Sequence, residues 1–346
     1  MSHRDESDGR AIEFVETFYA GASMEIFFYE VFEEEAAALR RYLPADWSVS
    51  MTAAAIQETD HGAPPAAVIS TRTQSVVPPS WAPGLKGILS RSAGYDHLQR
   101  FLAKAAVPVP VGHLFAYSGR AVAEHAALLW MALLHRLPRQ LHAMARFQRD
   151  HLTGRECQGR TLCVFGAGDI GGHVATIARG LGMRVLAVDP VRRWPDLHYV
   201  DKHTGVAEAD VAVCAMNLNE TNDRYFDPET LAALKPGTVL VNIARGECTR
   251  CTDVLEALIS GHLGGVGLDV YAAESVIAAG LRAGAPPDHP EYRAFAALRT
   301  RDDVILTPHN AFNTLEAVER KSLQSVRQLA YFRQHGTFSP VEPLET

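Results

Sequence analysis

RTLCVFGAGDIGGHVATIARGLGMRVLAVDP, residues 160–190, is the stretch that decides how the rest of the chain is read. Its short apolar run at 161–165 predicts a buried parallel strand. Apolar residues at helical spacing over 170–181 predict a helix, and residues 184–188 predict a second strand that ends in Asp189. A strand, a glycine-rich turn, a helix and a second strand in this order are typical of a nucleotide-binding βαβ unit.

The glycines of this stretch, Gly166, Gly168 and Gly171, have the spacing G-x-G-x-x-G. The first permits a tight turn, the second lets a pyrophosphate approach the backbone, and the third lets helix and strand pack closely. The start of the helix predicted at 170–181 offers free N–H groups to the phosphates, which includes Asp169 and Ile170 in the cofactor-binding set. The carboxylate of Asp189 can accept hydrogen bonds from the adenosine ribose. The stretch therefore predicts dinucleotide binding.

Composition sets the class of protein. The 346 residues, 47% hydrophobic and 21% charged, predict two globular domains. A net charge of −7 without long single-sign blocks argues against a nucleic-acid surface. Five cysteines fit reduced thiols in a cytoplasmic protein, and the C-x-x-C of Cys248 and Cys251 lacks the second pair that a zinc site needs, so no metal is expected. The longest apolar run, 126–134, is too short to cross a membrane.

Strands and helices alternate along the chain. Strands are predicted at 24–29, 48–54, 66–70, 87–90, 107–110, 211–216, 238–243, 264–270 and 304–307. Helices are predicted at 10–19, 33–42, 120–149 with a break at Pro138, 228–233, 254–260 and 314–334. Residues 275–303 are predicted to form a long loop over the site. This alternation predicts doubly wound α/β sheets.

Three predicted strand ends carry residues for hydride-transfer chemistry: Arg245, Glu274 with Asp269 before it, and His309. A 2-hydroxy acid needs a cation for its carboxylate, and a guanidinium supplies a bidentate one. The hydroxyl proton needs a base near neutrality, most often His, and a carboxylate can orient that imidazole. Taken singly, a surface Arg, a hydrogen-bonded loop His and a solvated Glu are equally consistent with the sequence.

In combination, several motifs of this chain resemble those of the D-isomer-specific 2-hydroxyacid dehydrogenases, and most closely those of their D-lactate dehydrogenase branch. The motifs are FFYEVFEEE, RSAGYDHL, AYSGRAVAEHA, LTGRECQGRTLCVFGAGDIGG, VNIARG, LDVYAAE and TPHNAFNT. The resemblance implies two Rossmann-like domains with doubly wound parallel sheets. A flavodoxin-like substrate domain would take residues 1–111 and 309–346, and an inserted NAD-binding Rossmann domain residues 112–308. It also implies a homodimer through the region of the helix that begins near Arg120.

The resemblance assigns roles to individual residues. Arg245 would bind the substrate carboxylate and carbonyl, His309 would be the acid/base, and Glu274 would pair with His309 and tune it. The cofactor-binding set is Gly166, Gly168, Asp169, Ile170, Gly171, Asp189, Ala244 and Asp269, the last of these at the nicotinamide carboxamide. The substrate set comprises the backbone amides of Ala93 and Gly94 with the side chains of Tyr117 and Arg72. Arg72 is a hypothesis from the residues alone: a second cation at a strand end, for a dicarboxylate or other anionic substrate, with a surface Arg as the alternative.

Several residues depart from the family pattern. Asn217 stands where Pro is usual, Arg250 where Asp is common, and Ser275 where Pro follows the catalytic Glu. Asp189 disfavours NADP by repelling its 2′-phosphate, although the neighbouring Arg192 and Arg193 make this preference moderate.

The predicted function is reversible hydride transfer between NADH and a 2-oxo acid. Formate dehydrogenase is disfavoured because it has Gln where this chain has Glu274. Two alternatives stay open, because both keep Arg, Glu and His: a dehydrogenase of the same fold acting on phosphite, and a non-catalytic NADH-sensing corepressor that binds peptides. Turnover distinguishes a sensor from an enzyme.

Overall fold

The computed structural model describes residues 24–340, which divide into two compact units. One unit consists of the chain up to Tyr117 together with the chain from Thr314 onward, and the other is Ser118–Asn313. The helix predicted at 10–19 lies outside the described residues. Among residues 24–340, no helix combines the length and the apolar character needed to cross a bilayer.

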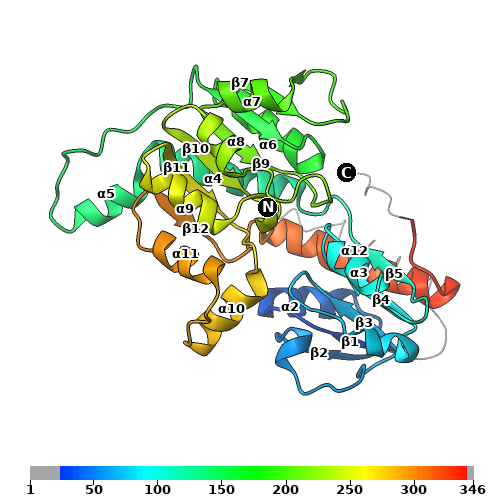
Figure 1. Ribbon diagram of the computed structural model, residues 1–346. Coiled ribbons are helices and arrows are strands. Elements are labelled where there is room, and N and C mark those ends of the chain that lie inside the picture. Colours follow the sequence, from blue (N-terminus) through cyan, green and yellow to red (C-terminus); the bar gives the residue numbers. More distant parts are fainter. Residues whose placement is uncertain (1–23, 341–346) are drawn as a thin grey trace, which may run out of the picture. The chain divides into compact units, whose positions relative to one another are not determined.

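The first unit is built on a five-stranded parallel sheet with the order β2-β1-β3-β4-β5. Its strands are β1 (Glu25–Phe28), β2 (Ser48–Met51), β3 (Val68–Thr71), β4 (Gly87–Ser90) and β5 (Val111–His113). Its helices are α2 (Glu33–Tyr42), α3 (Asp96–Leu102) and α12 (Leu315–His335), with short 3₁₀ turns η1 (Ile56–Glu58) and η2 (Pro79–Gly84). The last helix, from the far end of the chain, packs on α2 and β4, and so completes this unit (Figure 1).

The second unit is built on a seven-stranded parallel sheet with the order β12-β11-β10-β9-β6-β7-β8. Its strands are β6 (Thr161–Phe165), β7 (Arg184–Val188), β8 (His198–Tyr199), β9 (Val211–Cys214), β10 (Thr238–Asn242), β11 (Leu263–Leu268) and β12 (Val304–Leu306). Its helices are α4 (Gly119–Leu134), α5 (Leu137–Met144), α6 (Asp169–Gly180), α7 (Lys202–Glu208), α8 (Pro228–Ala233), α9 (Cys251–Ile259), α10 (Glu274–Ala283) and α11 (Pro290–Leu298), with the 3₁₀ turn η3 (Gly246–Cys248). The order reverses at β6, which is the topological switch point where such sheets bind ligands.

Both sheets are the doubly wound parallel type that the sequence predicts, and many predicted elements agree with the structure. The central strands are buried on both faces, as continuous apolar runs such as 161–165 require. One core lies on one face of the sheet of the second unit, and another lies on one face of the sheet of the first unit, against β3 and β4.

Three expectations were wrong in detail. The strand predicted at 107–110 lies at Val111–His113, because Pro108 and Pro110 lack the N–H that a ladder needs and the pairing with β4 begins after them. The loop predicted at 275–303 contains α10 and α11, whose apolar residues Ile277 and Phe295 pack into the core. The helix predicted at 120–149 breaks at Arg136, which has a left-handed φ of 55°.

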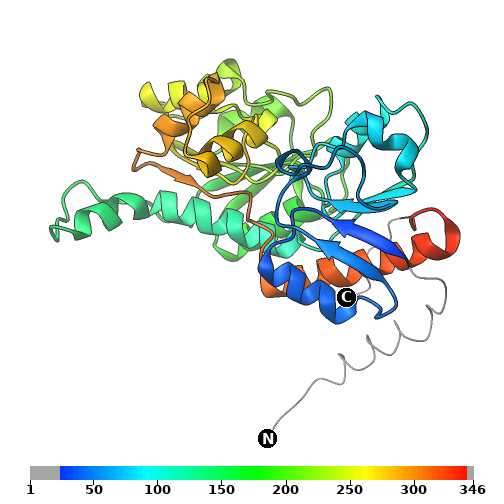
Figure 2. The same cartoon turned by 90° about the horizontal axis from the view of Figure 1, so that it is seen from below.

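Pro138 lies just inside the helix that follows this break, a position that suits a residue without an N–H. Helix α4 packs against β10, β11 and α6 of its own unit, and α5 extends beyond them (Figure 2). No residue of α5 is buried.

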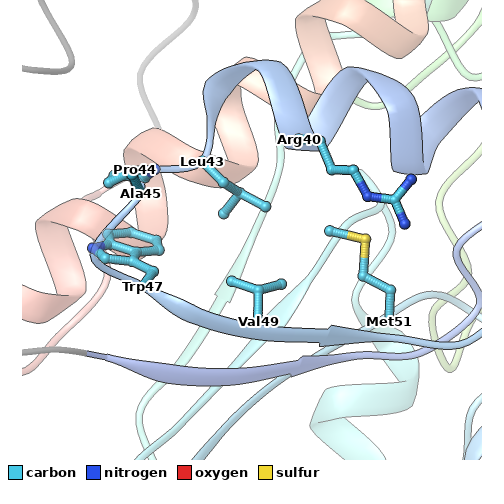
Figure 3. Close-up of a pocket in the computed structure, with 7 residues that line it drawn as sticks. All are labelled: Arg40, Leu43, Pro44, Ala45, Trp47, Val49 and Met51. Atoms are coloured by element: carbon cyan, nitrogen blue, oxygen red, sulfur yellow. The ribbon is translucent and has the colours of Figure 1, made fainter.

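The first unit also contains a pocket of about 260 Å³ between α2 and the edge strand β2. Leu43, Val49 and Met51 project into it, Trp47 lies at one end and Arg40 at the other (Figure 3). Its lining residues include none of the predicted site residues.

Candidate active site

Three neighbouring parallel strands bring the predicted catalytic residues to one edge of the second sheet. Strand β11 pairs with β10 on one side and with β12 on the other, and Asn242, Leu268 and Leu306 lie in register at their carboxyl ends. Arg245 follows the first of these strands, Asp269 and Glu274 follow the second, and His309 follows the third. The sheet therefore gathers residues that are far apart in the sequence.

The imidazole of His309 faces the carboxylate of Glu274. Its Nδ1 atom lies 2.9 Å from Oε1 and 2.9 Å from Oε2 of Glu274. Both side chains are about four-fifths buried, with exposed fractions of 19% and 21%. The carboxylate accepts the Nδ1 proton and so fixes the tautomer and the plane of the ring. This leaves Nε2 as the ring atom that can exchange a proton with a substrate.

The backbone is strained next to both members of this pair. His309 has a φ of 52°, and Ala273, the residue that caps α10 in front of Glu274, has a φ of 56°. Non-glycine residues rarely occupy this left-handed region, and such strain is concentrated at functional sites. The N–H of His309 donates to the carbonyl of Thr307 at 3.0 Å, which closes a tight turn around Pro308.

Asp269 holds the loop that carries His309. Its carboxylate, 1% exposed, accepts a hydrogen bond from Oγ1 of Thr307 at 2.6 Å and from the N–H groups of Asn310 and Ala311 at 2.8 and 3.0 Å. The Nε2 atom of His125, on α4, lies 3.1 Å from the same Thr307 hydroxyl. The carboxylate for which the family resemblance implies a contact with the nicotinamide thus holds the loop that carries His309.

Tyr271 also forms hydrogen bonds to the segment that leads to His309. Its hydroxyl donates to the carbonyl oxygens of Thr307 at 2.7 Å and Leu268 at 3.1 Å. Burial, with the nearby negative charge of Asp269, raises the pKa of Tyr271 far above its usual range. The phenol is therefore a permanent hydrogen-bond donor at working pH.

The turn that carries Arg245 is built by its neighbours. Buried Asn242 donates to the carbonyl of Arg245 at 2.8 Å and accepts the N–H of Ala244 at 2.9 Å. A Cβ atom at Gly246 would lie 1.8 Å from the carbonyl carbon of Tyr271, so this position accepts only glycine. The turn after β10 consequently packs directly on the segment that leads to Glu274. The Nη1 atom of Arg245 donates to the carbonyl of Ala244 at 2.9 Å.

The glycine-rich turn between β6 and α6 fits a dinucleotide. Gly166 has a φ of 96°, and a Cβ atom at Gly171 would lie 2.0 Å from the carbonyl oxygen of Gly166. A Cβ atom at Gly168 would meet nothing within 4 Å, which leaves the backbone open to a pyrophosphate. Helix α6 begins at Asp169, so the N–H groups of Asp169 and Ile170 belong to its first turn.

Asp189 lies beside this turn, at the end of β7. Its Oδ2 accepts the N–H of Ala167 at 2.6 Å and its Oδ1 accepts the N–H of Val191 at 2.7 Å. Each carboxylate oxygen has a second lone pair that can accept from a ribose hydroxyl. The residues present therefore fit the adenosine and pyrophosphate of NAD.

The predicted substrate residues of the first unit follow strands β3 and β4, which pair in register at Thr71 and Ser90. Arg72 comes directly after β3, and Ala93 and Gly94 lie in the turn after β4. Within residues 24–340, no hydrogen bond uses the N–H of Ala93 or Gly94. Tyr117 ends this unit, and its carbonyl accepts Nε of Arg320 at 2.8 Å.

Glu30 fixes the loop that begins at Arg72. Its carboxylate accepts the N–H groups of Arg72 at 2.9 Å, Gln74 at 3.0 Å and Ser75 at 3.0 Å. Glu30 itself has a left-handed φ of 57°. Three backbone bonds to one carboxylate hold the Arg72 backbone in a single conformation.

A buried charge cluster lies under this loop. Oε1 of Glu35 accepts a hydrogen bond from Nε of Arg91 at 2.9 Å and forms an ion pair with Nζ of Lys321 at 2.8 Å, and all three side chains are fully buried. The Lys321 ammonium lies 4.7 Å and the Arg72 guanidinium 5.9 Å from the ring centre of Phe32. The local charge is thus positive, with three cations around Glu35.

The electrostatics of the cluster follow from burial and these cations. Burial would raise the pKa of Glu35, but Arg91, Lys321 and Arg72 outweigh it and lower that pKa to about 2. Burial, together with Arg72 and Arg91, lowers the pKa of Lys321 to about 7 although Glu35 acts in the opposite direction. The pKa of Lys321 falls because its ammonium is fully buried and the nearby Arg91 and Arg72 guanidinium groups repel a further positive charge.

The five cysteines are free thiols in buried positions. Burial and the carboxylate of Glu291 raise the pKa of Cys251 to about 12, whereas Cys248 contacts Cys214. The two sulfurs of the C-x-x-C thus have different neighbours. Among the described residues no group of three or more His, Cys, Asp or Glu side chains is placed to hold a metal ion.

Residues 126–311, all within the second unit, match the family model of the NAD-binding domain of D-isomer-specific 2-hydroxyacid dehydrogenases. The chain belongs to this family. The D-lactate dehydrogenase of Escherichia coli (strain K12) is 32% identical over 260 residues, 73% of this dehydrogenase and 78% of that protein. The D-specific alpha-keto acid dehydrogenase of Enterococcus faecalis is 30% identical over 253 residues, 72% and 76% of the two chains.

A solved structure supports the same relationship. The D-lactate dehydrogenase of Aquifex aeolicus, complexed with NAD and lactic acid, is 27% identical to this dehydrogenase and superposes with a TM-score of 0.78, over 92% of this chain and 99% of that one. The dehydrogenase is an NAD-dependent oxidoreductase related to the D-lactate dehydrogenases.

Several residues that build the site have no signal in the sequence. Tyr271 and Asn242 donate hydrogen bonds to backbone carbonyls that only the fold brings near, and the hydroxyl of Thr307 donates to the carboxylate of Asp269. Glu30 resembles any strand-end acid, and Lys321 resembles a surface lysine of an amphipathic helix. His125 was visible inside the motif AVAEHA, but nothing in the sequence indicates that it would meet Thr307.

Proposed function

We propose that this dehydrogenase interconverts 2-oxo acids and D-2-hydroxy acids of the lactate type, with His309, Glu274 and Arg245 as its catalytic residues. The observation that carries the proposal is the contact between Nδ1 of His309 and both carboxylate oxygens of Glu274 at 2.9 Å, at a sheet edge that also carries Arg245. When bound, NADH supplies the hydride that reduces C2 of the substrate.

The side chains supply the proton and the charge. In the reductive direction, Nε2 of protonated His309 donates a proton to the carbonyl oxygen, and Glu274 stabilises the imidazolium before transfer. The Arg245 guanidinium binds the carboxylate and polarises the carbonyl, which stabilises the developing alkoxide. In the oxidative direction neutral His309 takes the hydroxyl proton.

Cofactor contacts are proposed for the turn and helix start described above, with Asp189 at the ribose, Ala244 and Asp269 on the nicotinamide side. For the substrate, the amides of Ala93 and Gly94 would hold the carboxylate, with Tyr117 beside it. Arg72 would act as a second cation that favours substrates with anionic side chains, as the positive charge around Glu35 supports.

The domain boundaries proposed from the sequence are 1–111 with 309–346 for the substrate domain and 112–308 for the NAD-binding domain.

We further propose a homodimer formed through α5. Leu141 and Met144 are 67% and 64% exposed and lie on one helix face with Leu137, and Phe147, 68% exposed, follows the helix. A continuous apolar surface of this kind on a protein marks an interaction site. The five buried free thiols support a cytoplasmic location.

The test is oxidation of NADH by a panel of 2-oxo acids: pyruvate, 2-oxobutyrate, 2-oxoisocaproate, phenylpyruvate, hydroxypyruvate, glyoxylate and oxaloacetate. His309→Ala is expected to lose turnover while it still binds NADH. Phosphite with NAD is tested in parallel. Turnover on phosphite alone would replace the 2-oxo acid proposal, and tight NADH binding without turnover on any substrate would identify a sensor.

A further inference from the structure

Trp194, in the loop after β7, is bonded to the glycine-rich turn. Its indole Nε1 donates to the carbonyl oxygen of Ala167 at 3.0 Å and to that of Gly168 at 3.1 Å. Its backbone N–H donates to the hydroxyl of Tyr199 at 3.1 Å, so the loop is held on its other side as well. One side chain thus bonds two successive carbonyl groups of the turn that binds the dinucleotide.

These bonds direct the N–H groups of the turn, together with the helical bond that the N–H of Gly172 donates to the Gly168 carbonyl at 3.0 Å. In a trans peptide the C=O and the N–H point in opposite directions. Because Trp194 holds the carbonyls of Ala167 and Gly168, the N–H groups of Gly168 and Asp169 point away from the indole. Within residues 24–340, no hydrogen bond uses the N–H of Gly168. Two consecutive donors are therefore preset at the start of α6, where an anion is favoured.

The loop that carries Trp194 also fixes the other side of Ala167. Asp189, at the start of that loop, accepts the N–H of Ala167 at 2.6 Å, while Trp194 donates to its C=O. Both polar groups of the residue between Gly166 and Gly168 are thus bonded by the segment that follows β7. The glycines give this turn its shape, and the loop removes the freedom that glycines would otherwise leave it.

The indole of Trp194 packs directly against the backbone of Gly172. A Cβ atom at this position would lie 2.4 Å from Cε2 and 2.5 Å from Cζ2 of Trp194. Gly172 is not part of the G-x-G-x-x-G spacing, and glycine inside a helix costs about 1 kcal/mol relative to alanine. The second glycine of the Gly171–Gly172 pair is thereby explained, because any side chain there would displace the ring.

We propose that Trp194 is a positioning residue for NAD: it holds the glycine-rich turn, through the Ala167 and Gly168 carbonyls, in the conformation whose N–H groups receive the pyrophosphate. Gly172 is the second half of this device, because it admits the ring. The proposal concerns the binding of the cofactor and is independent of the roles of His309, Glu274 and Arg245.

Trp194→Phe tests the hydrogen bonds, because it keeps an aromatic ring and removes the N–H. The dissociation constant of NADH, measured by NADH fluorescence on the full chain without substrate, is expected to rise about five- to tenfold, the effect of one or two neutral hydrogen bonds. Trp47→Phe, in the other unit, is the matched control and is expected to bind NADH as the unmodified protein does. Unchanged NADH affinity in a folded Trp194→Phe protein would overturn the proposal.

Gly172→Ala independently tests the contact between Gly172 and the indole of Trp194. The added methyl is expected to displace the indole and weaken NADH binding to a similar extent, although alanine favours the helix. Because both changes act on one contact, Gly172→Ala with Trp194→Ala is expected to bind NADH no worse than Trp194→Ala alone. Losses that simply multiply in the double variant would show that the two residues act separately, and would overturn the proposal. Circular dichroism establishes that each variant is folded.

Discussion

Nδ1 of His309 is equidistant from the two carboxylate oxygens of Glu274, 2.9 Å from each. Glu274→Gln keeps the shape of the partner but removes its charge, so the imidazolium loses its stabilising ion pair. We expect kcat for reduction to fall by about 100-fold, the lower range for general acid–base catalysis. Steady-state kinetics of reduction checks this, with Glu229→Gln, on the surface of α8, as control. A kcat like that of the unmodified enzyme would contradict the role of Glu274.

Arg72 should distinguish between substrates. Arg72 comes directly after β3, and its guanidinium lies near the buried cluster of Glu35, Arg91 and Lys321, which has more cations than anions. Arg72→Ala is expected to lower kcat/KM for oxaloacetate about tenfold more than kcat/KM for pyruvate, the effect of a charge-assisted hydrogen bond. The ratio of the two kcat/KM values is the measurement, and Arg100→Ala, an exposed arginine paired with Asp96, is the control. An unchanged ratio would mean that Arg72 does not contact the substrate side chain.

Asp189 should set the preference between NADH and NADPH. Its carboxylate would lie close to a 2′-phosphate, and like charges repel. Asp189→Ser keeps an acceptor without the charge, and is expected to raise kcat/KM for NADPH relative to NADH by about tenfold. Asp196→Ser, an exposed acid of the same loop, should leave the ratio as it is. If both variants changed the ratio equally, the effect would belong to overall charge and not to Asp189.

Lys321 should make the stability of the enzyme depend on pH. Burial and the neighbouring Arg72 and Arg91 lower the pKa of Lys321 from its ordinary value of 10.5 to about 7. Between these values the unfolded chain binds the proton that the folded chain has released, so the free energy of unfolding rises with pH. The contribution can reach about 1.4 kcal/mol per pH unit. Below pH about 7 both states are protonated, and the full penalty of the buried charge remains.

Urea unfolding from pH 7 to 9 measures this slope. Lys321→Met removes the titrating group, so the unmodified enzyme should gain stability with pH more steeply than the variant. Lys104→Met, an exposed lysine of the same unit, should keep the steeper slope. Equal slopes in the enzyme and in Lys321→Met would show that Lys321 does not titrate in this range.

The apolar face of α5 should hold two copies of the enzyme together. A double change of Leu141→Glu and Met144→Glu places charges on this face, and is expected to convert a dimer to a monomer in sedimentation analysis. His142→Glu adds a charge to the same helix away from Leu141 and Met144, and should preserve the dimer. A double variant that sediments as the unmodified protein does would place the interface elsewhere.

The sequence determined the features that depend on local order. The run 161–165, the glycine turn and Asp189 follow one another along the chain, so periodicity and spacing predict the βαβ unit and its ligand. The predicted ends of α2, β4, β6, β7 and α8 agree with the structure. The sequence also predicted Arg245, Glu274 and His309 as strand-end residues, since the ends of parallel strands share one edge.

Tertiary structure alone decided what depends on contact between distant segments. Residues 275–303 fold into α10 and α11 because Ile277 and Phe295 find a core to pack against, which no local pattern shows. Asp269 turned out to hold the loop of His309, since its Oδ1 meets Thr307 across the sheet edge. One buried cluster brings together Glu35, Arg91 and Lys321 from three separate segments. The indole of Trp194 packs against Gly172, where no Cβ atom would fit. Hydrogen bonds and burial act over a few ångströms in space, and sequence separation does not reveal them.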